Sequence, residues 1–205
     1  MTGEKQKIVV LASTNQGKVR EINQMLDAVL PGIVVEGLDK YPQIGEIPET
    51  GTTFEENALI KARTVCQKTG LASIADDSGL SVPALNGAPG VYSARYAGKK
   101  ATDEDNNQKL LEAMQDLKGD KRRALFICVM AAVAPDGREL LARGEWEGLV
   151  ALEPAGDNGF GYDPLFYDPE VGLHSAQMPP EQKNIRSHRG KALKSLAQQW
   201  EDFFQ

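Results

Sequence analysis

The alternation of short apolar runs with amphipathic segments is the feature that most limits the folds open to this chain. Residues 8–12, IVVLA, are typical of a buried strand, and the apolar residues of 19–29 then recur at helical spacing. The same order returns as a strand predicted at 33–38, a helix at 54–70 and a strand at 71–75. Strands that alternate with helices favour an α/β sheet with ligand sites at the strand ends.

The second half of the chain carries a different pattern, in which long strands are joined by a short turn. Its predicted elements are a helix at 103–117, a β-hairpin formed by 124–133 and 139–152 around the turn PDGR, a glycine-rich loop at 153–164, and a final helix from about Gly190 to Phe204. No repeat, low-complexity tract or linker interrupts it. We therefore expect one α/β domain over residues 1–205, in which the hairpin region forms a second lobe with no boundary marked by composition.

Composition restricts the class of protein. A chain of 205 residues that is 41% hydrophobic can bury a substantial core, and its net charge of -6 argues against a polynucleotide partner. Cys66 and Cys128 are far apart and form no CxxC pair, so neither a zinc ribbon nor a disulfide framework is expected. The longest apolar run, residues 124–134, is too short to span a bilayer. We expect a cytoplasmic protein with no membrane partner.

The segment LASTNQGKVREI, residues 11–22, resembles a phosphate-binding loop without two of its parts. Ala12 and Val19 occupy the positions where a Walker loop needs a glycine and a hydroxyl residue. Asn15 is instead a good N-cap, so the backbone amides that follow it and the side chain of Lys18 could meet a phosphate at a helix start. The segment therefore predicts part of an anion site without a Walker magnesium ligand.

Two adjacent aspartates, Asp76 and Asp77, follow directly on the apolar run LASI. Because side chains alternate along an extended segment, we expect them to point in different directions. In one interpretation both cap a turn before Gly79; in the other, one of them performs catalysis. Carboxylates such as Glu49 lie nearby in sequence, and oxygen ligands are those that Mg²⁺ prefers.

Histidine content narrows the chemistry further. His174 and His188 are the only two histidines, which excludes a multi-histidine metal centre. If the chain is an enzyme, carboxylate-held Mg²⁺ acting on a phosphate ester or anhydride is the natural candidate.

Two further segments have a simple and a functional interpretation each. The basic run KNIRSHRGK, 183–191, is either a solvated start of the last helix or a site for a ligand that accepts hydrogen bonds. The loop GDNGFGYDP, 156–164, is either a tight turn with a core aromatic or a platform that presents Phe160 to a base. Together with the aspartates, they indicate a nucleotide ligand.

Six motifs, taken in order and spacing, carry a family resemblance that runs over nearly the whole chain. They are STNQGKVREI (13–22), ETGTTFEENALIKA (49–62), ADDSGL (75–80), GAPGVYSARYAG (87–98), GFGYDPLF (159–166) and KNIRSHRGKAL (183–193). The chain resembles the inosine triphosphate pyrophosphatase family, most closely its bacterial branch. That branch hydrolyses XTP, ITP and dITP to the monophosphate and pyrophosphate with Mg²⁺, which keeps these nucleotides out of DNA and RNA.

The resemblance implies a role for each matching residue. Asp77 would accept the proton of the attacking water and, with Glu49, would hold Mg²⁺, while Lys18 would supply charge to the triphosphate. The residues implied in substrate binding are Ser13, Thr14, Asn15, Gln16, Gly17, Lys18, Ser78, Phe160, Gly161, Tyr162, Asp163, Lys183, His188 and Arg189. The implied fold is an elongated central mixed sheet flanked by helices, with two lobes, an active-site cleft between them, and a homodimeric assembly.

One departure and two alternatives accompany the resemblance. Pro179 and Pro180 stand where the family usually continues helically, so the motifs do not fix the shape of the wall before Lys183. The Maf-like nucleotide pyrophosphatases are an alternative with a different base preference, although they open with a serine-proline-arginine turn. A non-catalytic nucleotide-binding protein is the other, and intact Asp77 and Lys18 argue against it. The motifs do not rank ITP against XTP or dITP, and they do not show which residue rejects GTP.

Overall fold

The computed structural model describes residues 7–29 and 32–204. The strands are β1 (Lys7–Leu11), β2 (Ile33–Gly37), β3 (Ala72–Ser81), β4 (Arg123–Val133), β5 (Glu139–Val150), β6 (Phe166–Asp168) and β7 (Leu173–His174). The helices are α1 (Gln16–Val29), α2 (Phe54–Thr69), α3 (Asp103–Ala113), α4 (Pro180–Arg186), α5 (His188–Gln198) and α6 (Trp200–Phe204). In the described part of the chain, no helix is long and apolar enough to cross a membrane.

A mixed seven-stranded sheet organises the chain, in the order β2-β1-β3-β4-β5-β6-β7. β1 pairs in parallel with β2 and β3, whereas β5, β6 and β7 pair antiparallel. The two parallel pairings require helical crossovers, which α1 and α2 provide. The predicted α/β class with a mixed sheet and flanking helices is confirmed.

The chain divides into two compact units. Unit 1 contains residues 1–77, 129–144 and 191–205, and unit 2 contains residues 78–128 and 145–190. β3 passes from unit 1 to unit 2 between Asp77 and Ser78.

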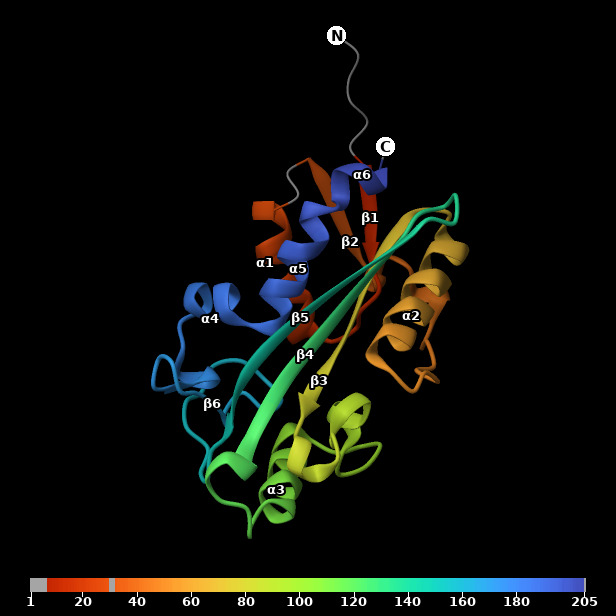
Figure 1. Cartoon of the computed structure of the whole chain (residues 1–205). Coiled ribbons are helices and arrows are strands. Elements are labelled where there is room, and N and C mark those ends of the chain that lie inside the picture. Colours follow the sequence, from red (N-terminus) through yellow and green to blue (C-terminus); the bar gives the residue numbers. More distant parts are fainter. Residues whose placement is uncertain (1–6, 30–31, 205) are drawn as a thin grey trace. The chain divides into compact units, whose positions relative to one another are not determined.

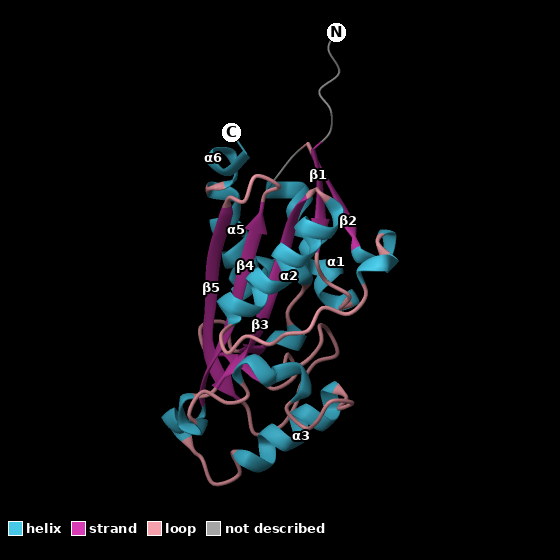
Figure 2. Cartoon of the chain, turned by 90° about the vertical axis from the view of Figure 1, so that its right-hand side faces the viewer, coloured by secondary structure: helices cyan, strands magenta, loops and turns pink. Residues whose placement is uncertain are grey.

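Unit 1 is a sheet covered on both faces. α1 and α5 lie on one face and α2 lies on the other (Figures 1 and 2). Buried apolar residues such as Val10, Leu26 and Val65 fill both layers. α2 begins at the N-cap Thr53 and ends at Gly70, whose left-handed φ of 69° and N–H to the Cys66 carbonyl form the predicted C-cap.

Unit 2 has a core of its own, made of large apolar side chains. Phe126 lies at its centre, with ring centroids 4.5 Å from Phe166 and 6.4 Å from Trp146. α3 packs its buried Leu110 into this core, and a reciprocal capping box between Thr102 and Asp105 fixes the start of the helix.

Several predicted boundaries were wrong, and packing explains the differences. β3 does not end at Ala75 but continues to Ser81 as a strand of the sheet, so Asp76 and Asp77 lie inside it. α3 ends at Ala113, short of the expected 117, because the chain turns there to offer carbonyls to Arg122.

The helical end of the chain is also more divided than expected. The predicted helix from about Gly190 to Phe204 is split into α5 and α6 around Gln199. A separate helix, α4, precedes it, with Pro180 at its first turn, where the missing N–H costs nothing. At the other end of the chain, α1 reaches Val29 as expected, and residues 30 and 31 lie outside the described part.

Candidate functional site

The turn between β1 and α1 is built as a capped helix start. The N–H of Ala12 donates to the Ile74 carbonyl at 2.7 Å, which ties the end of β1 to β3. The Asn15 side chain then accepts the N–H of Lys18 at 3.1 Å, which confirms Asn15 as the N-cap. Ser13 is half-buried and Thr14 is exposed beside this turn.

The two aspartates of β3 point to opposite faces, as the alternation of an extended strand predicts. Asp76 pairs with Lys18 of α1, with 3.0 Å between Nζ and Oδ2. Asp77 pairs with α2, on the other face of the sheet. Both are buried, at 2% and 5% exposure, so the interpretation that they merely cap a turn is wrong.

Lys61 joins two carboxylates of unit 1. Its Nζ donates to Oδ1 of Asp77 at 3.0 Å and to Oε1 of Glu49 at 2.9 Å. One turn earlier on α2, the Asn57 amide donates to Oδ2 of Asp77 at 3.2 Å, and its carbonyl oxygen accepts the N–H of Gly51 at 2.8 Å. We call Lys18, Glu49, Asn57, Lys61, Asp76 and Asp77 the β3 cluster.

Burial and charge set the protonation behaviour of this cluster. Burial raises the pKa of Asp77 above its ordinary value of 3.8, while Lys61 and Lys18 offset part of that rise. Burial alone would lower the pKa of Lys61, but the three nearby carboxylates outweigh it, so this pKa is raised. The lysine therefore stays positively charged beside an aspartate that is more basic than an exposed one.

The donor set of the β3 cluster suits a hard cation. Glu49 and Asp77 each place an oxygen within hydrogen-bond distance of one lysine nitrogen, so their carboxylates converge. Within the described residues, no group of three or more metal-binding side chains is preassembled. Mg²⁺ characteristically takes one or two carboxylates and completes its shell with water and substrate phosphates, which fits this pair.

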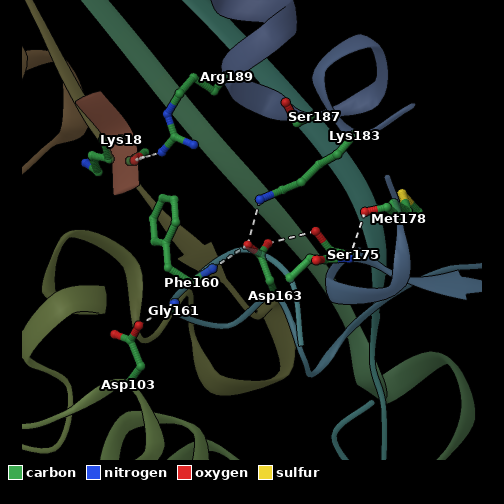
Figure 3. Close-up of polar contacts among 12 residues, drawn as sticks. Lys18, Asp103, Phe160, Gly161, Asp163, Ser175, Met178, Lys183, Ser187 and Arg189 are labelled. Carbon is green, nitrogen blue, oxygen red and sulfur yellow. Dashed lines mark hydrogen bonds and ion pairs between the residues drawn. The ribbon is translucent and has the colours of Figure 1, made fainter. Parts of the chain in front are cut away.

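A second cluster, in unit 2, is centred on Asp163 (Figure 3). Its Oδ2 accepts from Lys183 Nζ at 2.6 Å and from the Phe160 N–H at 2.9 Å. Its Oδ1 accepts the hydroxyl of Ser175 at 2.7 Å. Because the carboxylate is buried and fully occupied, it fixes the glycine-rich loop 156–164 against α4 and the turn at Ser175.

The aromatic ring of Phe160 lies beside two cations. Lys183 Nζ and Arg189 Cζ are each 5.4 Å from its centroid, within the range of cation–π attraction. Arg189 also donates to the hydroxyl of Ser78 at 3.1 Å. We call Ser78, Phe160, Asp163, Ser175, Lys183 and Arg189 the Asp163 cluster.

The basic run 183–191 folds into a corner between two helices. Lys183 and Arg186 lie in the last turn of α4, where basic side chains are favoured, and so precede the last helices of the chain. The corner is tight, since a Cβ on Gly190 would meet the Asn184 carbonyl oxygen at 1.7 Å. His188 is buried, and its ring stacks on Phe126 at 4.6 Å.

The structure thus gathers the implied site residues into two groups. Lys18, Glu49 and Asp77 share the β3 cluster, and Phe160, Asp163, Lys183, Arg189 and Ser78 share the Asp163 cluster. Tyr162 is buried, and its hydroxyl donates to the Ser93 carbonyl at 2.9 Å, so its side chain supports the core of unit 2.

Three residues with strong contacts in these clusters were missed by the sequence reasoning. Asn57 and Lys61 were detectable in principle, because they lie one turn apart among the apolar residues that α2 buries. Ser175 carries no such signal, since its contact with Asp163 depends on the fold of the intervening loop.

The α/β fold thus carries a buried carboxylate–lysine cluster in unit 1 and an aromatic–cation cluster in unit 2. A family model described as the Ham1 family matches residues 9–199. The chain belongs to this family, which confirms the resemblance carried by the sequence motifs.

Relatives and solved structures agree with that assignment. The chain is 55% identical to a dITP/XTP pyrophosphatase of Nitratidesulfovibrio vulgaris over 96% of this chain and 97% of that protein. It is 52% identical to a dITP/XTP pyrophosphatase of Vibrio cholerae over 93% and 94% of the two chains. A HAM1 protein from Coxiella burnetii superposes with a TM-score of 0.86 at 44% identity, over 96% of this chain and 99% of that chain.

Proposed function

We propose that this protein is a nucleoside triphosphate pyrophosphatase that hydrolyses dITP, XTP and ITP to the monophosphate and pyrophosphate. The observation that carries the proposal is the buried Asp77 of β3, held by Lys61 and Asn57 and accompanied by Glu49 and Lys18. Close relatives named dITP/XTP pyrophosphatase support the substrate class. Such an activity removes non-standard purine nucleotides before a polymerase incorporates them.

Asp77 is the proposed general base. A raised pKa strengthens a carboxylate as proton acceptor, and Lys61 and Asn57 hold both of its oxygens in fixed directions. Asp77 would orient the attacking water and take its proton as the bond to phosphorus forms. Pyrophosphate then leaves with the electron pair of the broken anhydride bond.

Lys18 and the capped start of α1 are the proposed phosphate contacts. Backbone amides at the start of a helix favour anions, and the residues 13–18 supply those amides together with a lysine. Lys18 is only 16% exposed and pairs with Asp76, which holds its ammonium group close to β3.

Mg²⁺ is the proposed cofactor, with Glu49 and Asp77 as its protein ligands. When bound, it would neutralise charge on the phosphate oxygens and polarise the phosphorus for attack. Lys61 would keep the two carboxylates converged and would limit their mutual repulsion.

The Asp163 cluster is the proposed selector of the purine base. Phe160 offers a ring for stacking, and Lys183 and Arg189 are donors suited to the 6-oxygen of hypoxanthine or xanthine. Adenine presents a donor at that position, and an unpaired buried donor costs about 1–3 kcal/mol. His188 and the backbone of Gly161 and Asp163 complete the residues proposed to surround the base.

A substrate panel tests the proposal. With Mg²⁺, the protein is expected to release pyrophosphate from ITP, XTP and dITP far faster than from ATP or GTP. Release of orthophosphate, or equal rates on ATP, would contradict it. A Maf-like preference would appear as faster turnover of a different base, and a binding-only protein would retain nucleotide without product.

The assembly and location follow as smaller proposals from the family. We propose a homodimer that works in the cytoplasm, where nucleotide pools are made. Light scattering coupled to size-exclusion chromatography measures the first directly, and a monomer at micromolar concentration would refute it.

A further inference from the structure

Gly161, in the glycine-rich loop next to Phe160, is held by both of its backbone groups. Its N–H donates to Oδ2 of Asp103 at 2.6 Å, and its carbonyl accepts from the amide of Asn107 at 2.9 Å (Figure 3 shows the first contact). Both side chains come from α3, more than fifty residues away along the chain. One helix, α3, therefore holds Gly161 through hydrogen bonds to both of its backbone groups.

The start of α3 is suited to this task. Residues 103 and 107 are one helical turn apart, so their side chains project from the same face. The capping box fixes the first turn, since the Thr102 hydroxyl accepts the N–H of Asp105 at 3.1 Å and Asp105 accepts the N–H of Thr102 at 2.8 Å. Asp103 and Asn107 therefore approach the loop from a defined backbone.

The peptide N–H that Asp103 holds is the one that directly follows Phe160, so this contact restricts the backbone of Phe160. The φ of Gly161, 63°, is left-handed, and the N–H of Phe160 is already committed to Asp163 at 2.9 Å. Asp163 therefore holds the peptide before Phe160, and Asp103 holds the peptide after it. The two contacts from α3 thus limit the backbone rotation of the segment 160–161.

The orientation of the Asn107 amide is set by this contact. A flipped amide would place Oδ1 against the carbonyl oxygen of Gly161, which cannot donate. In the observed orientation Oδ1 is buried and has no hydrogen-bond partner among the described residues. The bond to Gly161 therefore sets the orientation of this side chain.

We propose that Asp103 and Asn107 are positioning residues that hold Gly161, and through it Phe160, in place for the purine base. The inference rests on the proposed function, because it assigns these residues to base recognition. They act through Phe160 and do not touch the substrate. Their loss lowers affinity for the nucleotide and leaves the chemical step intact.

Asp103→Ala, with Glu104→Ala as its matched control, gives the first test. Both variants remove one carboxylate from the first turn of α3, but only Asp103 contacts Gly161. The expected result for Asp103→Ala is a rise of about five- to tenfold in KM for ITP, as for one lost hydrogen bond to a charged group, with kcat unchanged within about twofold. Glu104→Ala should match the wild type, and Asp103→Asn, which keeps an oxygen acceptor, should restore most of the affinity.

Asn107→Ala, with the neighbouring Gln108→Ala as control, gives the second. Gln108 is exposed and bonds to Glu112, away from the loop. Hydrogen exchange of the peptide that covers 159–163 should become faster in Asn107→Ala and in Asp103→Ala, and it should stay unchanged in both controls. KM should rise in parallel with exchange across the four variants.

Three results would overturn the inference. Equal KM values for Asp103→Ala and Glu104→Ala would assign the effect to helix charge. Faster exchange with unchanged KM would show that the loop geometry does not govern base binding, and a fall in kcat alone would place the role in chemistry. A wild type that fails to turn over ITP contradicts the proposed function instead; the dissociation constant of inosine monophosphate, measured by calorimetry, then replaces KM in the same comparison.

Discussion

The β3 cluster and the Asp163 cluster differ in the kind of structure that carries them. In the β3 cluster the side chains come from a central strand and two regular helices, with Glu49 added from the loop before α2, and each carboxylate has a lysine partner. In the Asp163 cluster all residues but Ser78 of β3 come from a glycine-rich loop, a short turn and a helical corner, with an aromatic ring beside two cations.

This contrast fits two different roles, chemistry in the β3 cluster and choice of ligand in the Asp163 cluster. Proton transfer and metal binding need groups fixed within fractions of an ångström, and strands and helices supply that rigidity. Choice among ligands depends on contacts that loops can vary without disturbing the core. Changes in the β3 cluster should therefore act on kcat, and changes in the Asp163 cluster should act on KM and selectivity.

The largest expected effect follows from Asp77→Asn. Removing a general base typically costs about 10²- to 10⁴-fold in rate, so kcat should fall in that range for ITP, XTP and dITP alike. The fold should survive, because the new side chain has the same size, with about 1 kcal/mol lost where Asn57 now meets an amide. Pyrophosphate release measures kcat, and circular dichroism measures whether the fold is retained.

Asp39→Asn, at an exposed acid of unit 1, is the control. A similar kcat in both variants would show that the base is misassigned.

Phe160→Ala tests the role of the Asp163 cluster in binding the base. Stacking on an aromatic ring contributes about 1–3 kcal/mol per base, so KM for ITP should rise about ten- to hundredfold. The kcat should change little, because Phe160 belongs to unit 2 whereas the proposed base Asp77 belongs to unit 1. Phe160→Tyr keeps the ring and should stay near the wild type. If kcat fell and KM did not, the proposed division between the clusters would be wrong.

The regular elements of the fold were predictable because apolar periodicity and capping residues are local signals. Asn15 and Gly70 cap their helices as expected, and the hairpin turn at 135–138 lies where its sequence places it. The extension of β3 through Asp76 and Asp77 was not predictable from local preference, because aspartate is depleted in strands. The ion pairs with Lys18 and Lys61 offset the cost of burying these two carboxylates, so the strand can continue through them.

The site was predictable only as far as motifs extend. Motifs point to Asp77 and Glu49, and Lys61 stands out as a lysine that α2 buries, but its pairing with both carboxylates joins α2 to β3 and to the loop before α2. The basic run 183–191 is expected from sequence as a solvated helix start or a ligand site, and it folds as a corner whose geometry depends on the close approach at Gly190. Such contacts arise from tertiary packing and leave no periodic pattern in the sequence.

Arg122 stabilises irregular backbone in unit 2, where much of the Asp163 cluster lies on loops. Its buried guanidinium donates to four carbonyls, those of Met114, Leu117, Val150 and Ala151. Arg122→Ala should lower the free energy of unfolding by about 3 kcal/mol, since several buried acceptors lose their donor. Urea denaturation measures this. The exposed neighbour Arg123→Ala should change stability by no more than about 0.5 kcal/mol. Equal losses would show that the four carbonyls find other partners.

The smallest expected effect concerns Asp168. It is a buried aspartate, as Asp77 is, but the pKa values of the two are shifted in opposite directions. Asp77 has a raised pKa, whereas Asp168 of unit 2 has a lowered one: burial alone would raise it, but the bonds from Arg186 at 2.8 Å and Trp146 at 2.9 Å outweigh burial. A lowered folded-state pKa contributes stability above the ordinary value of 3.8, and this contribution is lost as pH falls through the folded-state value. Asp168→Asn should therefore lower the free energy of unfolding by about 1 kcal/mol at pH 7, and it should flatten the fall of Tm in acid.

Glu170→Gln is the control. It removes the exposed carboxylate that shares Arg186 and should leave that acid dependence in place. Parallel Tm curves for wild type and Asp168→Asn between pH 2 and 7 would mean that this carboxylate is not the structural anchor of unit 2.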